Sequence, residues 1–222
     1  MPRKDTDEMT SRIGLVVNQF GNSPLSKSPL AQEPLKASPE TVLAMVMDAM
    51  IKSKPISHNL SQKTVNHLIE SGYHHIDKLQ NSTWEERTMV LKEGGYSRYR
   101  EVTATNLGNL ADFVISEYDG DLNNLLKKAH GQREKTRTLM KEIKGIGDLA
   151  VELFFDSVQS VWPSIAPFID SRSLQTAKEV GIRADMDGIY NALHQDPKQM
   201  SWFANGLSVV RLEKRESDIE AM

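Results

Sequence analysis

The 222-residue sequence predicts an all-α fold, and three observations support this prediction. Apolar residues recur three and four positions apart in one segment after another, as they do on the buried face of a helix. Residues 39–222 show no strand-like alternation followed by a hairpin turn. Proline and glycine fall where the periodic segments stop, at the positions where helices usually end.

The expected helices follow one another with short loops between them. The first begins at Pro39, with Ser38 as its N-cap, and stops before Pro55. The next ones repeat the same apolar spacing, and most of them are closed by glycine. They are expected at about residues 60–69, 77–79, 84–91, 102–115 and 122–126, with stops at Gly72, Gly94-Gly95 and Asp119-Gly120.

The sequence before this first helix differs from the rest. Proline recurs every five positions among serines, at Pro24, Pro29, Pro34 and Pro39. Proline removes a backbone donor and fixes φ, which disfavours regular structure. Residues 13–17 could form a short strand, but nothing nearby offers it a partner. We therefore expect residues 1–38 to be a proline-rich, flexible arm and residues 39–222 to be the folded domain.

The composition excludes several classes of chemistry. The chain has no cysteine, which excludes disulfides, thiolate nucleophiles, and zinc or iron–sulfur clusters bound by cysteine. No apolar run approaches the ~20 residues that span a bilayer, so we expect an intracellular protein with no membrane partner. The formal net charge is −3, so binding to nucleic acid would have to come from a local basic patch.

The most informative stretch is residues 134–158. Leu139 and Ile143 lie four positions apart on one expected helix, and residues 149–161 carry the apolar face of a second one. Only Lys144-Gly145-Ile146-Gly147 separates the two helices. The two glycines permit a tight turn with positive φ, and Ile146 can fill the gap between the helices. Such a turn leaves backbone N–H groups unpaired at the positive end of the second helix, where they can bind an anion.

This hairpin lies in a locally basic region. Residues 127–144 contain seven Lys or Arg residues, among them Arg137, Lys141 and Lys144, against two Glu residues. A hairpin with such a basic excess indicates binding to a phosphate backbone. The alternative is a purely structural turn with a solvated basic face.

These residues resemble a known family, the helix-hairpin-helix DNA glycosylases of the endonuclease III superfamily. The stretch from Leu139 to Ala150 is similar to their hairpin, and the stretch from Trp162 to Asp170 is similar to the one that leads to their catalytic aspartate. The resemblance covers about residues 39–182. It implies two helical subdomains with a cleft between them. Their expected bounds are about residues 58–149 for the hairpin subdomain, and residues 39–57 plus 150–222 for the other.

The resemblance also implies a function in base excision DNA repair. A glycosylase of this family binds double-stranded DNA that contains a damaged or mismatched base, and it rotates that base out of the stack. The family aspartate, here Asp170, would stabilise the positive charge that develops on the sugar as the base leaves. A monomer is expected, in the cytoplasm at the nucleoid or in the nucleus.

The sequence departs from the family in three places. In the members that also cleave the strand, a lysine two residues after the second hairpin glycine forms a Schiff base. Leu149 holds this position here, so we expect water to be the nucleophile and no lyase activity. The segment before Asp170 is a few residues longer than in the family. The iron–sulfur cluster of many relatives would need cysteines, so no cofactor is expected, while a structural cation at the hairpin stays an open alternative.

Asp170 also has a structural interpretation. Aspartate is a favoured N-cap, and the apolar spacing of another helix begins at Leu174. A cap alone is therefore the alternative to a cap that also takes part in catalysis. Arg172 could pair with Asp170, which would keep the carboxylate ionised, or it could contact a DNA phosphate.

Four further site residues are candidates. Relatives that remove adenine carry a glutamate on the first helix that protonates the leaving base, and Asp48 is at a similar position; the alternative is an exposed helix residue. Ile56 lies in the loop where relatives insert a side chain into the DNA stack; the alternative is ordinary loop packing. Tyr96 and Phe168 are the aromatic candidates for the base pocket. No metal site is expected from the spacing of histidines and carboxylates.

Three functions are therefore compatible with the sequence. The first is a monofunctional DNA glycosylase. The second is a non-catalytic protein of the same fold that recognises bent or damaged DNA. The third is an interaction protein in which the hairpin is merely a turn.

Overall fold

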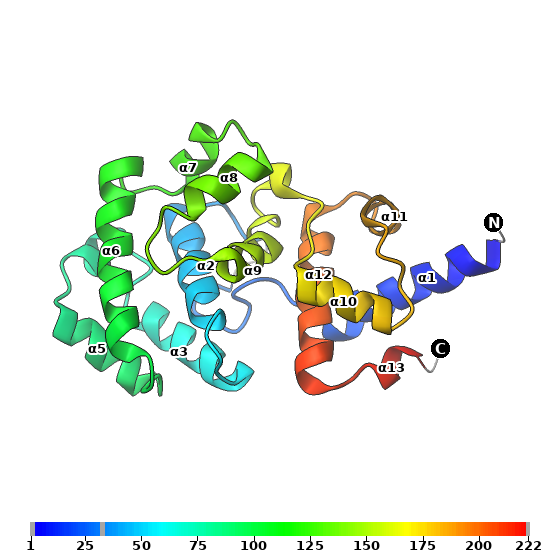
Figure 1. Ribbon diagram of the computed structural model, residues 1–222, viewed down its shortest axis with the longest axis horizontal. Helices are drawn as coiled ribbons and strands as arrows, with labels where there is room; N and C mark the ends of the chain where they lie inside the picture. Colours follow the sequence, from blue (N-terminus) through cyan, green and yellow to red (C-terminus); the bar gives the residue numbers. More distant parts are fainter. Residues whose placement is uncertain (1–2, 32–33, 221–222) are drawn as a thin grey trace. The chain divides into compact units, whose positions relative to one another are not determined.

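The computed structural model describes residues 3–31 and 34–220. These residues form thirteen α-helices, a π-helix and a 3-10 helix, with no β-strand among them, so the all-α prediction is confirmed (Figure 1). The elements are α1 Arg3–Leu15, a π-helix Val16–Phe20, α2 Pro39–Lys52, α3 His58–Glu70, α4 Ile76–Gln80, α5 Trp84–Glu93, α6 Arg100–Tyr118, α7 Asn123–Lys128, α8 Arg133–Met140, α9 Asp148–Val158, a 3-10 helix Pro163–Ile165, α10 Ser171–Glu179, α11 Met186–Ala192, α12 Pro197–Glu213 and α13 Ser217–Glu220. None of the helices in the described ranges is long and apolar enough to cross a bilayer.

The chain divides into two compact units. The terminal unit comprises Met1–Pro24 and Phe155–Met222, and the central unit comprises Leu25–Phe154. The expected division differs from this one: α2 belongs to the central unit together with the hairpin elements, the boundary lies after Phe154, and residues 1–24 belong to the terminal unit. The hydrophobic pattern gives the reason for α2: every residue of α2 from Thr41 to Ile51 is buried, so this helix needs neighbours on all its faces.

In the central unit, α2 packs against α3, and α6 packs against α4 and α5 (Figure 1). The predicted N-cap of α2 is confirmed, because Oγ of Ser38 accepts a hydrogen bond from the N–H of Thr41 at 3.2 Å. The predicted stop at Asp119-Gly120 is confirmed as well, since Asp119 takes a left-handed conformation with φ +52°. These local signals therefore place the helices of this unit correctly.

The terminal unit corrects the expectation of a flexible N-terminal arm. Residues 3–20 are helical, and the π-helix packs against α12. The spacing of the residues that this segment buries shows why: Met9, Ile13, Val16 and Phe20 lie four, three and four positions apart, and all four belong to the core of the unit. Gly206 of α12 permits the contact, because a Cβ there would lie 3.0 Å from the carbonyl oxygen of Val16.

The rest of the expected arm has no helix or strand where it is described. Residues 21–31 and 34–38 form turns and irregular backbone, while residues 1, 2, 32 and 33 lie outside the described residues. This segment is attached to the central unit by side-chain amides. Nδ2 of Asn66 donates to the carbonyl oxygen of Lys27 at 2.6 Å, and Nδ2 of Asn123 donates to that of Ala37 at 3.1 Å.

Candidate functional site

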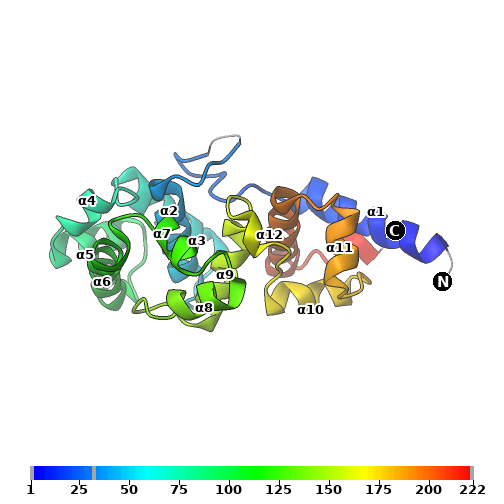
Figure 2. The ribbon, with the colours of Figure 1, turned by 90° about the horizontal axis from the view of Figure 1, so that it is seen from above.

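The hairpin between α8 and α9 in the central unit is the candidate DNA-binding element (Figure 2). Ile146 is 6% exposed and its N–H donates to the carbonyl oxygen of Ile143 at 3.1 Å, so the aliphatic residue is buried as predicted. The two glycines differ, which the sequence does not reveal. Gly145 has φ +88°, and a Cβ there would lie 2.4 Å from Nδ2 of Asn106 in α6, whereas Gly147 lies outside the left-handed region and has open space at its Cβ position.

The backbone after Gly147 has the polarity that an anion site requires. The N–H of Val151 makes the first hydrogen bond to a helix carbonyl, that of Gly147, at 3.0 Å. The amides of residues 148–150 therefore precede the first helical hydrogen bond of α9, as at any helix N-terminus. These amides and the helix dipole favour a negative charge at this end of α9.

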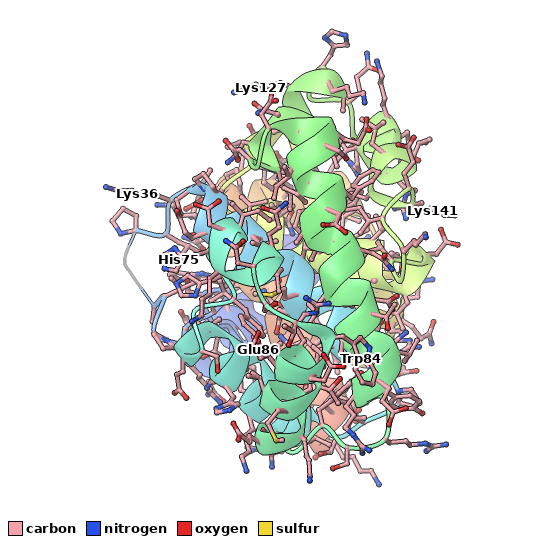
Figure 3. The ribbon with its side chains drawn as sticks, turned by 90° about the vertical axis from the view of Figure 1, so that its left-hand side faces the viewer. Lys36, His75, Trp84, Glu86, Lys127 and Lys141 are labelled. Atoms are coloured by element: carbon pink, nitrogen blue, oxygen red, sulfur yellow. The ribbon has the colours of Figure 1, made fainter. Side chains whose placement is uncertain are left out.

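An acidic side chain already lies at this helix end. Nζ of Lys141 is 2.8 Å from Oδ1 of Asp148, the first residue of α9, and both side chains are exposed. The hydrogen bond and the positive charge of Lys141 lower the pKa of the Asp148 carboxyl, so it is ionised at neutral pH. Lys141 projects at the outer edge of the molecule in Figure 3, and its charge is shared with Asp148.

The basic excess around the hairpin is partly compensated by neighbouring carboxylates. Nε of Arg137 lies 3.6 Å from Glu134, and Nζ of Lys128 lies 3.7 Å from Glu117. Lys144 is exposed in the turn itself. The local positive charge is therefore smaller than the sequence count suggests.

Asp170 is the candidate catalytic residue, and it lies in the terminal unit. It is the N-cap of α10 and is 0% exposed. Its Oδ1 accepts hydrogen bonds from the N–H groups of Arg172 at 2.9 Å and Ser173 at 3.2 Å. Its Oδ2 is also buried, but no hydrogen-bond partner for it occurs within the described part of the chain. An unpaired buried carboxylate oxygen is costly and calls for an explanation, of which a catalytic role is one.

Asp156 of α9 and Gln159, the residue that follows this helix, fix the backbone that leads to Asp170. Oδ1 of Asp156 accepts from the N–H of Asp170 at 2.9 Å. The side-chain amide of Gln159 pairs with both backbone groups of Phe168: Nε2 donates to the carbonyl oxygen at 2.9 Å, and Oε1 accepts from the N–H at 3.0 Å. Sequence reasoning missed both residues. No local signal could have found them, because they belong to no motif and the stretch Asp156-Ser157-Val158-Gln159-Ser160 is mostly polar.

The side chains of Asp170 and Arg172 do not form the ion pair that the sequence suggested. Arg172 contacts Asp170 through its backbone amide, and the residue is exposed. Its guanidinium group is therefore available to solvent or to an anionic partner, which was the other possibility that the sequence left open.

Asp48 is buried, which makes the alternative of an exposed helix residue wrong. It is 7% exposed on α2, and its Oδ2 lies 2.7 Å from Nζ of Lys52 one turn later. Burial of a charged carboxylate requires such a partner. Asp48 belongs to the central unit and Asp170 to the terminal unit.

The aromatic candidates have different environments. Tyr96 is 1% exposed, its hydroxyl accepts from Oγ1 of Thr103 at 3.4 Å, and burial raises the pKa of its phenol. It is a core residue of the central unit, so its choice as a stacking residue is wrong. Phe168 is 8% exposed and packs edge-on against Phe155, with ring centroids 5.2 Å apart. Ile56 is half-buried in the loop between α2 and α3.

The chain has no cysteine, so no cluster can be bound by cysteine. Across residues 3–31 and 34–220, no three His, Asp or Glu side chains come together in a group that could hold a metal ion.

Comparison with known proteins gives a likeness of structure and none of sequence. No protein-family model matches the chain, and no curated protein matches it. The structure is similar to the crystal structure of the H. pylori 3-methyladenine DNA glycosylase MagIII bound to 1,N6-ethenoadenine. The TM-score is 0.55 at 13% sequence identity, over 95% of this chain and 98% of that chain. At this identity the likeness is one of fold: the chain shares the all-α fold of that glycosylase, which confirms the fold class predicted from the sequence.

Proposed function

We propose that the chain is a monofunctional DNA glycosylase that hydrolyses the bond between a damaged base and its sugar. One observation carries the proposal: Oδ1 of Asp170 caps α10, while the buried Oδ2 has no partner in the described chain. Departure of a base creates a cation-like sugar, which a nearby carboxylate oxygen stabilises as the charge develops. The same oxygen can accept a proton from the attacking water.

Water is the proposed nucleophile because the hairpin lacks the lysine that would form a Schiff base. Leu149 occupies that position in α9, and an aliphatic side chain cannot attack the sugar. The predicted outcome of borohydride treatment is no covalent protein–DNA adduct. An adduct would show that another lysine acts as a nucleophile.

The proposed partner is double-stranded DNA with a damaged or mismatched base. The protein would bind it as a monomer inside the cell, at the nucleoid or in the nucleus. The hairpin would hold a phosphate through the backbone after Gly145, with Ile146 as its buried anchor and with Lys144 as an exposed cation. Further phosphate contacts are proposed for Arg137, Lys141 and Arg172. Ile56 would be the side chain that is inserted into the DNA stack, and Phe168 would form a wall of the base pocket. Asp48 would be the acid that protonates the leaving base.

A second candidate function is supported by the burial of Asp170. The residue is 0% exposed and already serves α10 as a cap, which suffices for a purely structural role. The chain would then be a non-catalytic protein that recognises bent or damaged DNA. The two candidates make opposite predictions for a substitution that keeps the cap and removes the charge.

Asp170→Asn is that substitution. Asparagine caps helices as well as aspartate does, and its Oδ1 can accept the same two amide hydrogens, so thermal stability should stay close to wild type. Asp196→Asn is a matched control, because Asp196 caps α12 of the same unit in the same way, accepting from the N–H of Lys198 at 2.8 Å. Excision is measured as strand cleavage after alkali on duplexes that each carry one uracil, oxidised, alkylated or mismatched base, with 1,N6-ethenoadenine included.

The results separate the candidates. The glycosylase proposal expects excision of at least one base by wild type, a loss of about 100-fold or more in Asp170→Asn, and no loss in Asp196→Asn. Both variants should still bind DNA, as measured by fluorescence anisotropy. No excision by wild type, or equal excision by Asp170→Asn, would leave only the DNA-binding candidate, and no binding to any duplex would exclude both.

A further inference from the structure

The segment that ends at Asp170 has no hydrogen-bonded secondary structure of its own. Residues 166–170 lie between the 3-10 helix and α10 and are irregular. Ile169 and Asp170 are nevertheless buried, at 4% and 0% exposure. Buried backbone groups in an irregular segment must find partners elsewhere. Those partners decide the conformation of the segment.

The partners come from one face of the last turn of α9 and the residue after it. Asp156 and Gln159 are three positions apart, so their side chains lie on the same face. Gln159 pairs with both backbone groups of Phe168, and Oδ1 of Asp156 accepts from the N–H of Asp170. Both residues are buried, at 2% exposure for Asp156 and 0% for Gln159. Side chains that are buried and hydrogen-bonded at this density have little freedom to move.

The position of Asp156 is itself fixed by a third element. The hydroxyl of Ser201 in α12 donates to the carbonyl oxygen of Asp156 at 2.6 Å, and Nε2 of Gln159 lies 3.2 Å from the same oxygen. The chain of contacts therefore runs from α12 through the end of α9 to the amide of Asp170. All of these residues belong to the terminal unit.

The hydrogen bond that Asp156 accepts is donated by the backbone of Asp170, the residue whose geometry matters for the proposed chemistry. Asp170 holds φ −62° and ψ 155°, the extended conformation of an N-cap, and this backbone sets the direction of its side chain. We infer that Asp156, supported by Gln159, is a positioning residue for Asp170: it fixes the backbone that directs the unpaired Oδ2. The inference rests on the proposed glycosylase function, and it assigns Asp156 a geometric role rather than a reacting one.

A pair of substitutions at Asp156 separates geometry from charge. Asp156→Asn keeps an oxygen that can accept from the amide of Asp170, while Asp156→Ala removes it. A displacement of about 1 Å at a reacting group can cost about 100-fold in rate. We therefore expect Asp156→Ala to lower the single-turnover excision rate about 10- to 100-fold, and Asp156→Asn to keep it within about 3-fold of wild type. The dissociation constant for the duplex should be unchanged in both.

Two further measurements distinguish positioning from general damage. Ile189→Val trims a fully buried residue of α11 in the same unit and should leave the excision rate unchanged. Amide hydrogen exchange at Asp170 should be faster in Asp156→Ala than in wild type and in Asp156→Asn. If Asp156→Ala does not fold, Gln159→Glu takes its place in the test. Glutamate still accepts from the N–H of Phe168, but it cannot donate to the carbonyl oxygen of Phe168. About a tenfold loss of rate is then expected.

Each outcome bears on a different claim. Wild-type rate in Asp156→Ala beside an inactive Asp170→Asn would overturn the positioning role and leave the glycosylase proposal standing. Equal losses in Asp156→Asn and Asp156→Ala would overturn the geometric explanation, since the asparagine retains the acceptor. If wild type excises none of the bases, the proposed function and this inference both fail.

Discussion

Gly145→Ala is the substitution for which the structure makes the sharpest stability prediction. Gly145 has φ +88°, a conformation that costs a residue with a side chain about 1–2 kcal/mol. Its Cβ would also lie 2.4 Å from Nδ2 and 3.2 Å from Cβ of Asn106, so the side chain of Asn106 must move. Adding about 1 kcal/mol for this overpacking, we expect a loss of about 2–3 kcal/mol in the free energy of unfolding.

Gly147→Ala is the matched control for this substitution. It makes the same chemical change two residues later, where φ lies outside the left-handed region and no atom comes within 4 Å of the new Cβ. Its expected cost is at most about 1 kcal/mol, mainly because alanine is a poor residue directly before a helix. Urea unfolding followed by circular dichroism measures both variants.

A double-mutant cycle with Asn106→Ala then separates the two parts of the cost. Shortening Asn106 removes the clash with Nδ2 but leaves the unfavourable φ, so Gly145→Ala should cost only about 1–2 kcal/mol in that background. Equal stability of Gly145→Ala and Gly147→Ala would refute the argument. It would mean that this turn does not hold the left-handed conformation on which the hairpin geometry depends.

Three other predictions address the charge, the pH response and the N-terminal helices. Asp148→Asn should strengthen DNA binding and steepen its salt dependence, because Lys141 becomes available to a phosphate. One added phosphate contact changes the affinity about 3-fold between 50 and 200 mM salt. An unchanged slope of log affinity against log salt concentration in an anisotropy titration would contradict this. His74→Gln should make the protein lose less stability below pH 6.5 than wild type does. The reason is that burial, and to a smaller extent the charge of His75, lower the pKa of His74 from 6.5. A lowered pKa means that the unfolded chain binds more protons, so stability is full above pH 6.5 and falls as the pH drops through the lowered pKa; melting temperatures of both proteins at pH 7.5 and 5.5 test it. Phe20→Ala should lower the free energy of unfolding by about 3 kcal/mol or more, since Phe20 is a core residue, whereas a flexible arm would show no change.

The features that could be predicted from the sequence depend on residues close together in the chain. Ser38 and Asp170 cap the helices that they precede, and Ile146 is buried between two glycines, as their neighbours indicated. Caps and turns are made by hydrogen bonds across two to four residues, so short patterns are enough to recognise them. The same holds for the class of the fold, because the 3.6-residue period is a property of each segment alone.

The features that could not be predicted depend on partners far away in the chain. The apolar spacing from Met9 to Phe20 was visible, but the nearby prolines favoured an arm, and the helix that covers this face lies almost 190 residues later. Asp156 and Gln159 carry no motif, since their importance lies in the backbone amides and carbonyls 9 to 14 residues further on. A local pattern contains no information about which distant group will fill a buried hydrogen bond.

By itself, the sequence determined the helices of the central unit, the caps at Ser38 and Asp170 and the glycine turn, because each of these follows from the conformational preferences of neighbouring residues; its composition determined the absence of cysteine chemistry. Only the tertiary structure decided that Tyr96 is a core residue, that Asp148 offsets Lys141 at the start of α9, and that one oxygen of Asp170 has no hydrogen-bond partner among the described residues. Burial and pairing arise from the packing of elements that are distant in the chain. The chemistry of this site is therefore decided by which polar atoms remain without a partner after the helices have packed.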